Sequence, residues 1–307
     1  MKTVKSLLTL SILTAFPMLS FASSVDIYGK ANLSLQSSDD GDGSYQEIKS
    51  NASRIGFKGS NEIDNGLFVV YKAEFGVDMD GDSDKGSSVT DRNQYIGLKG
   101  AFGEVLLGNN DSVLKQSQGK VDIFNGYNGD IKSLFKGENR VKDSITYKSP
   151  VFNAFQFGMT YITEDEVDAE NGLSLAVFYG DKSLKKSNVY AAIAVDNDVK
   201  EYDTTRVTLA TKLADIKLGG MFQTQKDMSG AKMDGIMLSA KYTLDKVDLK
   251  AQVQTADYED DTSKKGFSLG ADYKLASSTK LYAFYTSFDM DNDVDQKYLA
   301  LGIEYKF

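Results

Sequence analysis

The sequence predicts an all-β fold, a transmembrane antiparallel up-and-down β-barrel of about 16 strands. Apolar and polar residues alternate with a period of two along most of the chain, and aromatic residues recur where the alternating segments end. Successive side chains of a strand face opposite sides, so each segment has one apolar and one polar face. The segments run to roughly ten residues, which suits tilted strands that cross a bilayer and exceeds the usual length of soluble strands. A soluble β-sandwich also alternates, but these lengths weigh against it.

The first residues predict export from the cytoplasm. Lys2 and Lys5 give a positive start, residues 7–13 are largely apolar, and Ser20-Phe21-Ala22 supplies small residues before a cleavage point. This order is typical of a secretory signal peptide, here residues 1–22. The remaining residues, 23–307, are expected to form a single β-barrel domain. Their apolar runs are far shorter than the roughly 20 residues of a membrane-spanning helix, so strands are the expected spanning elements.

The alternating segments can be followed from one end of the chain to the other. The clearest are residues 25–36, 67–77, 155–161, 247–254 and 299–307. In the last of these, Leu299, Leu301 and Ile303 alternate with more polar neighbours. Aromatic residues at segment ends, where a girdle at the membrane interface is expected, are Tyr161, Tyr179, Tyr242, Tyr273 and Phe307. Residues 91–98 and 280–287 alternate less regularly, so the strand count is taken as about 16.

The connections between these segments fall into two groups. Short ones rich in Gly, Asn, Asp and Lys are expected to be periplasmic turns, and they include residues 60–65, 100–103, 181–186, 214–215, 244–246 and 276–279. Longer acidic ones are expected to be extracellular loops, and they include residues 39–42, 78–84, 164–170, 196–203, 257–261 and 289–295. An even strand number places both termini on the periplasmic side.

Two of the acidic loops resemble the opening of a calcium-binding loop. Residues 78–84 and 289–295 carry Asp at every second position, but their sixth residues are Ser83 and Val294, where an EF-hand requires Gly. Solvated acidic loops are therefore the prediction, and no metal site is expected. Weak bridging of divalent cations to lipopolysaccharide phosphates stays open as an alternative.

The composition excludes several functions. The formal net charge is −9, and the chain has no His and no Cys. Nucleic acid is an improbable partner for such an acidic chain, because phosphate binding needs a basic stripe. The missing His removes Ser-His-Asp catalysis and imidazole metal sites, and the missing Cys removes thiolate sites. We expect no enzyme and no cofactor. An adhesin or phage receptor that acts through the acidic loops is the alternative function.

Several motifs, taken in order, resemble the trimeric 16-stranded general porins of Gram-negative bacteria. The matching segments are residues 25–30 (VDIYGK), 53–59 (SRIGFKG), 97–99 (GLK) after Arg92, 102–105 (FGEV), and 145–150 (ITYKSP) after Arg140, with the terminal Phe307. The resemblance implies an outer-membrane porin, a water-filled channel for passive diffusion of ions and small hydrophilic solutes. It also implies a homotrimer that contacts outer-membrane lipid and lipopolysaccharide and that is assembled by the barrel-assembly machinery.

The resemblance further implies a charged pore constriction. Lys30, Arg54, Arg92 and Arg140 stand where the family has its basic wall. Residues 111–139, the longest connection without alternation, stand where the family has an inward-folded third loop, and Asp122 and Asp130 match its acidic pair. Gly126 stands in the place of the family's intervening glutamate. Lys30 and Arg54 also occupy polar-face positions, where a charge stays hydrated only if that face lines water. The alternative is that these residues are ordinary lumen charges.

Three further expectations concern assembly and ion flow. Phe307 resembles the terminal aromatic residue that the assembly machinery recognises. Residues 77–90 would be the loop that reaches a neighbouring subunit, although Asn109 replaces the arginine that receives this loop in some relatives. Additional lumen charges are expected from Lys72, Glu74, Arg206, Lys212, Lys217, Lys241 and Lys274. The acidic loops lead us to expect a modest cation preference.

Overall fold

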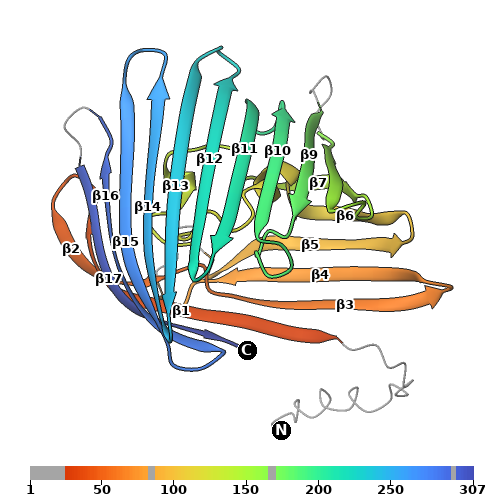
Figure 1. Cartoon of the computed structure of the whole chain (residues 1–307), viewed down its shortest axis with the longest axis horizontal. Helices are drawn as coiled ribbons and strands as arrows, with labels where there is room; N and C mark the ends of the chain where they lie inside the picture. Colours follow the sequence, from red (N-terminus) through yellow and green to blue (C-terminus); the bar gives the residue numbers. More distant parts are fainter. Residues whose placement is uncertain (1–24, 82–86, 165–170, 292–294) are drawn as a thin grey trace, which may run out of the picture.

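The computed structural model describes residues 25–81, 87–164, 171–291 and 295–307, and almost all of the regular structure is strand (Figure 1). The expected signal peptide, residues 1–22, lies outside the described residues. The strands are β1 (Asp26–Asp39), β2 (Ser44–Ser50), β3 (Arg54–Asp64), β4 (Leu67–Val77), β5 (Val89–Gly100), β6 (Gly103–Asp111), β7 (Arg140–Lys148), β8 (Phe155–Ile162), β9 (Gly172–Gly180), β10 (Val189–Asn197), β11 (Tyr202–Leu213), β12 (Ile216–Asp227), β13 (Lys232–Leu244), β14 (Val247–Tyr258), β15 (Ser263–Lys274), β16 (Thr279–Asp289) and β17 (Asp295–Lys306). None of the helices in the described part of the chain is long and apolar enough to cross a membrane.

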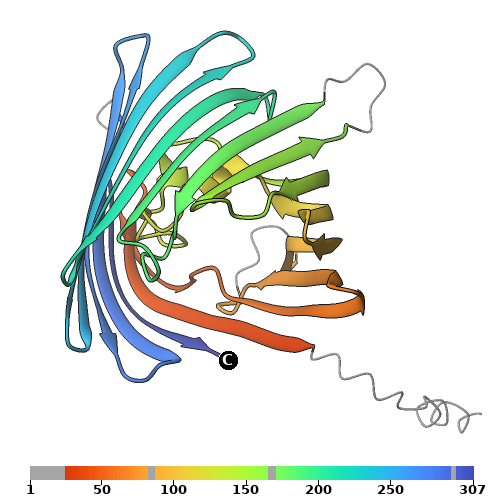
Figure 2. The ribbon, with the colours of Figure 1, turned by 45° about the vertical axis from the view of Figure 1, so that its right-hand side comes forward.

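The strands close into one antiparallel ring. The last strand, β17, pairs with β1 over ten residue pairs, from Lys30↔Lys306 to Asp39↔Lys297. Both β2 and β3 pair with β1, so they are two parts of one barrel strand that is interrupted at residues 51–53. The ring therefore has 16 barrel strands, which confirms the predicted barrel (Figure 2). Closure pairs every strand on both sides, because an unpaired edge in hydrocarbon would cost several kcal/mol per backbone group.

The two faces of the wall follow the predicted alternation. On β17, Leu299, Leu301 and Ile303 are exposed on the outside, whereas Tyr298 and Ala300 are buried inside. The same pattern repeats around the ring, and the five aromatic residues predicted for the membrane interface are all exposed. An outer face of this kind would be unstable in water and is stable against lipid.

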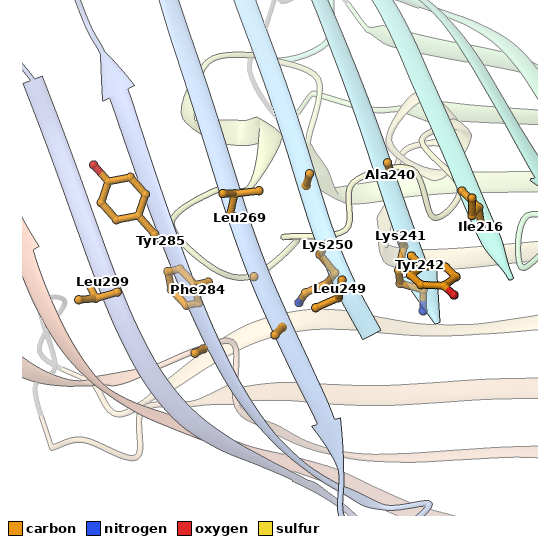
Figure 3. Close-up of a pocket in the computed structure, with 14 residues that line it drawn as sticks. Ile216, Ala240, Lys241, Tyr242, Leu249, Lys250, Leu269, Phe284, Tyr285 and Leu299 are labelled. Atoms are coloured by element: carbon orange, nitrogen blue, oxygen red, sulfur yellow. The ribbon is translucent and has the colours of Figure 1, made fainter. Parts of the chain in front are cut away.

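The outer face also holds an apolar hollow over strands β12 to β17, shown in Figure 3. Its volume is about 720 Å³, and small side chains open it, including Ala240, Ala251 and Ala283. Leu269 and Tyr285 also line it. This hollow lies on the lipid side of the wall, so it is no part of the passage through the barrel.

The two irregular segments have separate physical causes. In β16, Tyr282, Phe284 and Phe288 face inward and are almost fully buried, so this strand is apolar on both faces. In β5, the pairing with β4 shifts so that Arg92 and Asn93 together oppose a single residue of β4. Such a β-bulge breaks the period of two.

The connections differ in part from the expected lengths. Strands β10 and β11 extend into the expected loop 196–203 and leave only residues 198–201 between them. Strands β14 and β15 likewise leave residues 259–262. The strands and their cross-strand hydrogen bonds therefore include some residues that were expected in loops because of their acidic composition. In contrast, the connection at 181–188 is longer than the turn expected at 181–186. We call the end of the barrel that carries this connection and both termini the turn rim, and the opposite end the loop rim.

Candidate pore constriction

The third loop, residues 112–139 (L3), crosses the interior of the barrel (Figure 2). It contains a short helix α1 (Val113–Ser117) and a 3-10 turn η1 (Ile131–Ser133). Most apolar side chains of L3 are at most 9 % exposed, and those between Val121 and Phe135 pack against inward side chains of β12 to β17, as in the edge contact of Phe124 with Phe284 at 6.4 Å between ring centroids. Ile123 is partly buried in the same cluster, whereas Val113 and Leu114 pack against β9 and β10. Each fully buried side chain of this size contributes about 1.5–3 kcal/mol. L3 is therefore held on one wall of the barrel by a hydrophobic core.

Inward-facing glycines make room for L3. A Cβ atom on Gly219 would lie 2.8 Å from Val121, and one on Gly270 would lie 3.0 Å from Phe124. A Cβ atom on Gly235 would collide with the ring of Phe135. These glycines are not among the residues predicted for the site. Each is a glycine at a lumen-facing position within a long strand, and such a glycine can indicate that another segment packs closely against the strand.

Polar contacts fix both ends of L3. The Arg206 guanidinium, whose side chain is 0 % exposed, donates to the Glu138 carboxylate at 2.7 Å. The Tyr190 hydroxyl donates to the Ser117 carbonyl at 2.9 Å. Burial raises the pKa of the Glu138 carboxyl, and Arg206 opposes that rise. Arg206 was expected among the additional lumen charges, but its side chain is buried and paired with Glu138 of L3.

The two predicted acidic residues brace L3 from within. Asp130 accepts the backbone N–H groups of Gly126 at 2.8 Å and of Lys132 at 3.0 Å. Asp122 accepts the N–H groups of Phe124 and Ile131 at 3.1 and 3.2 Å. Burial raises the pKa of the Asp122 carboxyl well above its usual range, and the neighbouring Asp130 adds to the effect. Both carboxylates therefore stabilise the conformation of L3 through hydrogen bonds to its backbone.

Between L3 and the wall formed by β1, β3, β5 and β7 lies a polar cavity of about 460 Å³, which we call the constriction cavity. Its charged lining comprises the basic residues Lys30, Arg54, Arg92, Lys115, Lys120, Lys132, Arg140 and Lys182 and the acidic residues Asp111, Asp130 and Glu138. The structure thus brings together all four predicted basic residues and Asp130. Asp122 does not line this cavity and borders a different one on the far side of L3.

Irregular pairing positions the basic side chains. Arg54 follows the interruption at residues 51–53. Arg92 lies in the β5 bulge, and the β6–β7 pairing shifts between Gly108 and Asn110, one residue before Asp111 pairs with Arg140. Bulges bend a strand and re-aim its side chains, so they converge on the cavity where regular strands would not.

Carboxylates neutralise part of the basic wall. Arg92 pairs with Glu74 at 2.7 Å, and Arg140 pairs with Asp111 at 3.0 Å. Lys30 lies 3.8 Å from Glu304. Within residues 25–81, 87–164, 171–291 and 295–307, Arg54 has no ion-pair partner. Arg54 therefore carries a positive charge that no direct ion pair neutralises, and the carboxylates of Glu74 and Glu304 act on it only from a longer distance.

Sequence reasoning missed four basic residues of the constriction cavity. Lys115 and Lys132 lie in the short helical turns of L3. Lys120 comes from the middle of L3, and Lys182 comes from the connection 181–188. Neither Lys120 nor Lys182 lies on an alternating strand, so the alternation of polar and apolar residues could not indicate that they face the lumen. The other expected lumen lysines lie closer to the turn rim, where Lys241 and Lys274 share the carboxylate of Asp248.

A closed barrel with a lipid-facing outer surface, an inward loop and a charged interior defines a channel-forming membrane protein. The family model described as Gram-negative porin matches residues 8–293, and the chain belongs to that family. This confirms the predicted family and places the barrel in the outer membrane.

The relatives agree with this assignment. The chain is 30 % identical over 187 residues to the major outer membrane protein P.IB of Neisseria gonorrhoeae, covering 56 % of this chain and 52 % of that protein. It is 33 % identical over 129 residues to the P.IB protein of Neisseria sicca, covering 41 % of this chain and 35 % of that protein. The matches thus span about half the length of these relatives or less.

Solved structures show the same fold. The anion-selective porin from Comamonas acidovorans has a TM-score of 0.74 at 20 % identity, covering 93 % of this chain and 100 % of that one. OmpF of Salmonella typhi, in complex with daunomycin, has a TM-score of 0.74 at 18 % identity, covering 93 % of this chain and 98 % of that one.

Proposed function

We propose that this protein is a channel for passive diffusion of ions and small hydrophilic solutes, with its selective step at the constriction cavity. The observation that carries the proposal is the lining of that cavity, which has eight basic and three acidic side chains. Such a lining supplies hydrogen bonds and charge without enclosing a solute tightly. The chain has no His and no Cys, which removes the mechanisms that depend on these residues, and we assign no enzymatic reaction.

The roles proposed for the charged residues follow from their positions. Lys30, Arg54, Arg92 and Arg140 form the basic side. Asp130 faces them from L3, and Asp122 acts through the shape of L3. The excess of basic over acidic groups in the cavity supports anion preference. This replaces the cation preference expected from the acidic loops, because charge at the narrow part acts on ions at closer range than charge at the mouth.

Reversal potentials in planar bilayers test the proposal. The purified protein should conduct in KCl, and in a tenfold KCl gradient the sign should indicate chloride preference. Arg54→Gln should shift the ratio of chloride to potassium permeability toward potassium by about twofold or more, because it removes a positive charge that forms no direct ion pair. Lys226→Gln removes the same charge from an exposed position on β12 and should leave the ratio unchanged. Cation preference of the unmodified channel would overturn the proposed selectivity.

We also propose the remaining assignments on partners and processing. Residues 1–22 act as a signal peptide, and three copies of the barrel associate in the membrane beside lipopolysaccharide and lipid. A trimer form of OmpT from Vibrio cholerae has a TM-score of 0.70 to this chain at 19 % identity. The loop expected to reach a neighbour lies partly outside the described residues, and Asn109 donates to the carbonyl of Arg92 at 2.8 Å. Conductance steps in groups of three would support the trimer, and uniformly single steps would contradict it.

A further inference from the structure

The connection at residues 181–188 is a built structure that folds into the barrel instead of lying on its rim. The Asp181 carboxylate accepts the backbone N–H groups of Ser183, Lys186 and Lys185 at 2.9 to 3.0 Å, which lowers the pKa of Asp181 to about 2. Leu184 is 7 % exposed and packs with Tyr190 and Ala192 on the inner face of β10. These contacts hold the turn in one conformation.

A second polar cavity lies between this turn, the middle of L3, and the inner face of β12 to β15. Its volume is about 550 Å³, and its lining includes seven lysines and only two carboxylates. We call it the lysine cavity. The lysines come from three separate parts of the fold, as Lys120 comes from L3, Lys182 and Lys185 come from the turn, and Lys217 comes from β12. Figure 3 shows Lys241 on β13 and Lys250 on β14, the next strand of the barrel.

Three of the seven lysines are neutralised by carboxylates. Lys250 pairs with Asp272 at 2.7 Å, Lys241 pairs with Asp248 at 3.2 Å, and Lys306 pairs with Glu304 at 2.9 Å. The second carboxylate of the lining, Asp122, already accepts backbone N–H groups of L3. The cavity has no further carboxylate to offer the other four lysines.

Those four lysines keep most of their positive charge, since the Asp181 carboxylate, which acts on Lys217, already accepts three backbone N–H groups of the turn. Lys120, Lys182 and Lys185 form no ion pair in the described part of the chain, and Lys217 donates to the Ser183 carbonyl at 2.9 Å. Burial and then the neighbouring Lys182 lower the pKa of Lys120, which shows that the charges repel one another. An anion that bridges them would remove this repulsion.

We propose that the lysine cavity binds small tetrahedral dianions of the phosphate class, either inorganic phosphate or the phosphate group of a small monoester. A phosphate dianion offers several strong acceptor oxygens, and the lining of the cavity supplies lysines from L3, the turn and β12. A chloride ion has one charge and bridges fewer of them. The inference rests on the proposed channel function, since the cavity is reached through the lumen, and this position excludes the phosphate of a lipid headgroup.

Ion-current block tests the inference on the intact channel. Inorganic phosphate, added at constant ionic strength, should reduce the KCl current with half-block on the order of millimolar. Addition on the side of the turn rim should act at lower concentration than addition on the side of the loop rim. Glucose 6-phosphate should block in the same way and glucose should not, which separates the phosphate group from the sugar.

Variants locate the effect. Lys185→Gln lies in the lysine cavity and outside the lining of the constriction cavity, so it should weaken phosphate block while leaving KCl selectivity unchanged. The double variant Lys185→Gln/Lys217→Gln, whose two positions both lie outside the lining of the constriction cavity, should raise the half-blocking concentration at least tenfold. Lys226→Gln is the matched control and should behave as the unmodified protein.

The outcomes separate the two claims. Normal KCl conductance without phosphate block, or equal block in the double variant, would overturn the phosphate site and leave the channel intact. Absence of KCl conductance from a folded barrel would overturn the channel itself. Heat-modifiable migration on a denaturing gel establishes that each variant is folded.

Discussion

Arg206 is the largest fully buried side chain among the described residues, and Glu138 is the carboxylate that neutralises it. The pair joins L3 to β11 at a point where the Arg206 side chain is fully buried and the Glu138 side chain is only 8 % exposed. Gln118 also donates to Glu138, at 2.7 Å, so the carboxylate links two parts of L3 to the wall. A buried ion pair of this kind adds little to the free energy of unfolding. Removal of one partner lowers that free energy strongly, because the remaining charge stays buried away from water.

Replacement of Glu138 by Gln should therefore destabilise the folded channel. We expect a loss of about 3–5 kcal/mol in the free energy of unfolding, since Arg206 would remain charged and buried. The measurement is the temperature at which the folded form disappears on a denaturing gel. Glu259→Gln is the control, because its pair with Lys232 is more than half exposed and worth about 1 kcal/mol or less. An unchanged transition in Glu138→Gln would contradict the role of the Arg206–Glu138 pair in holding L3.

At the scale of elements, L3 and the inner faces of β12 to β16 form one packing unit. The glycines of that wall are part of the unit, since Phe124 and Phe135 occupy the space that side chains would otherwise fill. The barrel ring depends on backbone pairing, whereas the position of L3 depends on side-chain fit. A change in this fit should alter the pore without opening the ring.

Gly235→Ala tests this separation. The added methyl group meets the buried ring of Phe135, and such overpacking typically costs about 1–3 kcal/mol. We expect L3 to shift, with an altered single-channel conductance and a barrel that still migrates as folded. Gly220→Ala on the adjacent strand is the control, because its nearest contact is a Leu238 methyl group at 3.3 Å. Equal conductance in both variants would contradict the role of Gly235.

How far the sequence predicts each element depends on which surface the element faces. Strands β14 and β17 alternate clearly and are predicted, because their outer side chains are mostly apolar and most of their inner side chains are polar or small. Strand β16 did not alternate, because Tyr282 and Phe284 face L3 and make its inner side apolar. The bulge at Arg92 and the inward fold of residues 181–188 depend on pairing and packing between distant segments. The alternation of neighbouring residues does not depend on contacts between distant segments. The lysine cavity is formed by such contacts, so it could not be predicted from this alternation.

At the scale of the whole molecule, the barrel exists only when its two ends meet. Strand β17 pairs with β1, and Phe307 extends this contact by exchanging backbone hydrogen bonds with Gly29 at 2.9 and 3.2 Å. The Phe307 ring lies directly over Gly29, where any side chain would collide with it. The ring also stacks with Tyr305, at 6.0 Å between centroids. The terminal aromatic residue therefore has a packing function at the seam in addition to the assembly role we propose.

Two variants distinguish packing from recognition. Phe307→Ala removes the ring, whereas Gly29→Ala keeps the ring and displaces it. Both should lower the thermal transition of the purified barrel modestly, because each loses a contact worth about 0.5–1.5 kcal/mol. Only Phe307→Ala should reduce the fraction of protein that reaches the folded form in outer membranes, since only this variant lacks the aromatic residue during assembly. If Gly29→Ala reduced that fraction equally, the packing of the seam would account for the whole effect of Phe307, and the assembly role would be wrong.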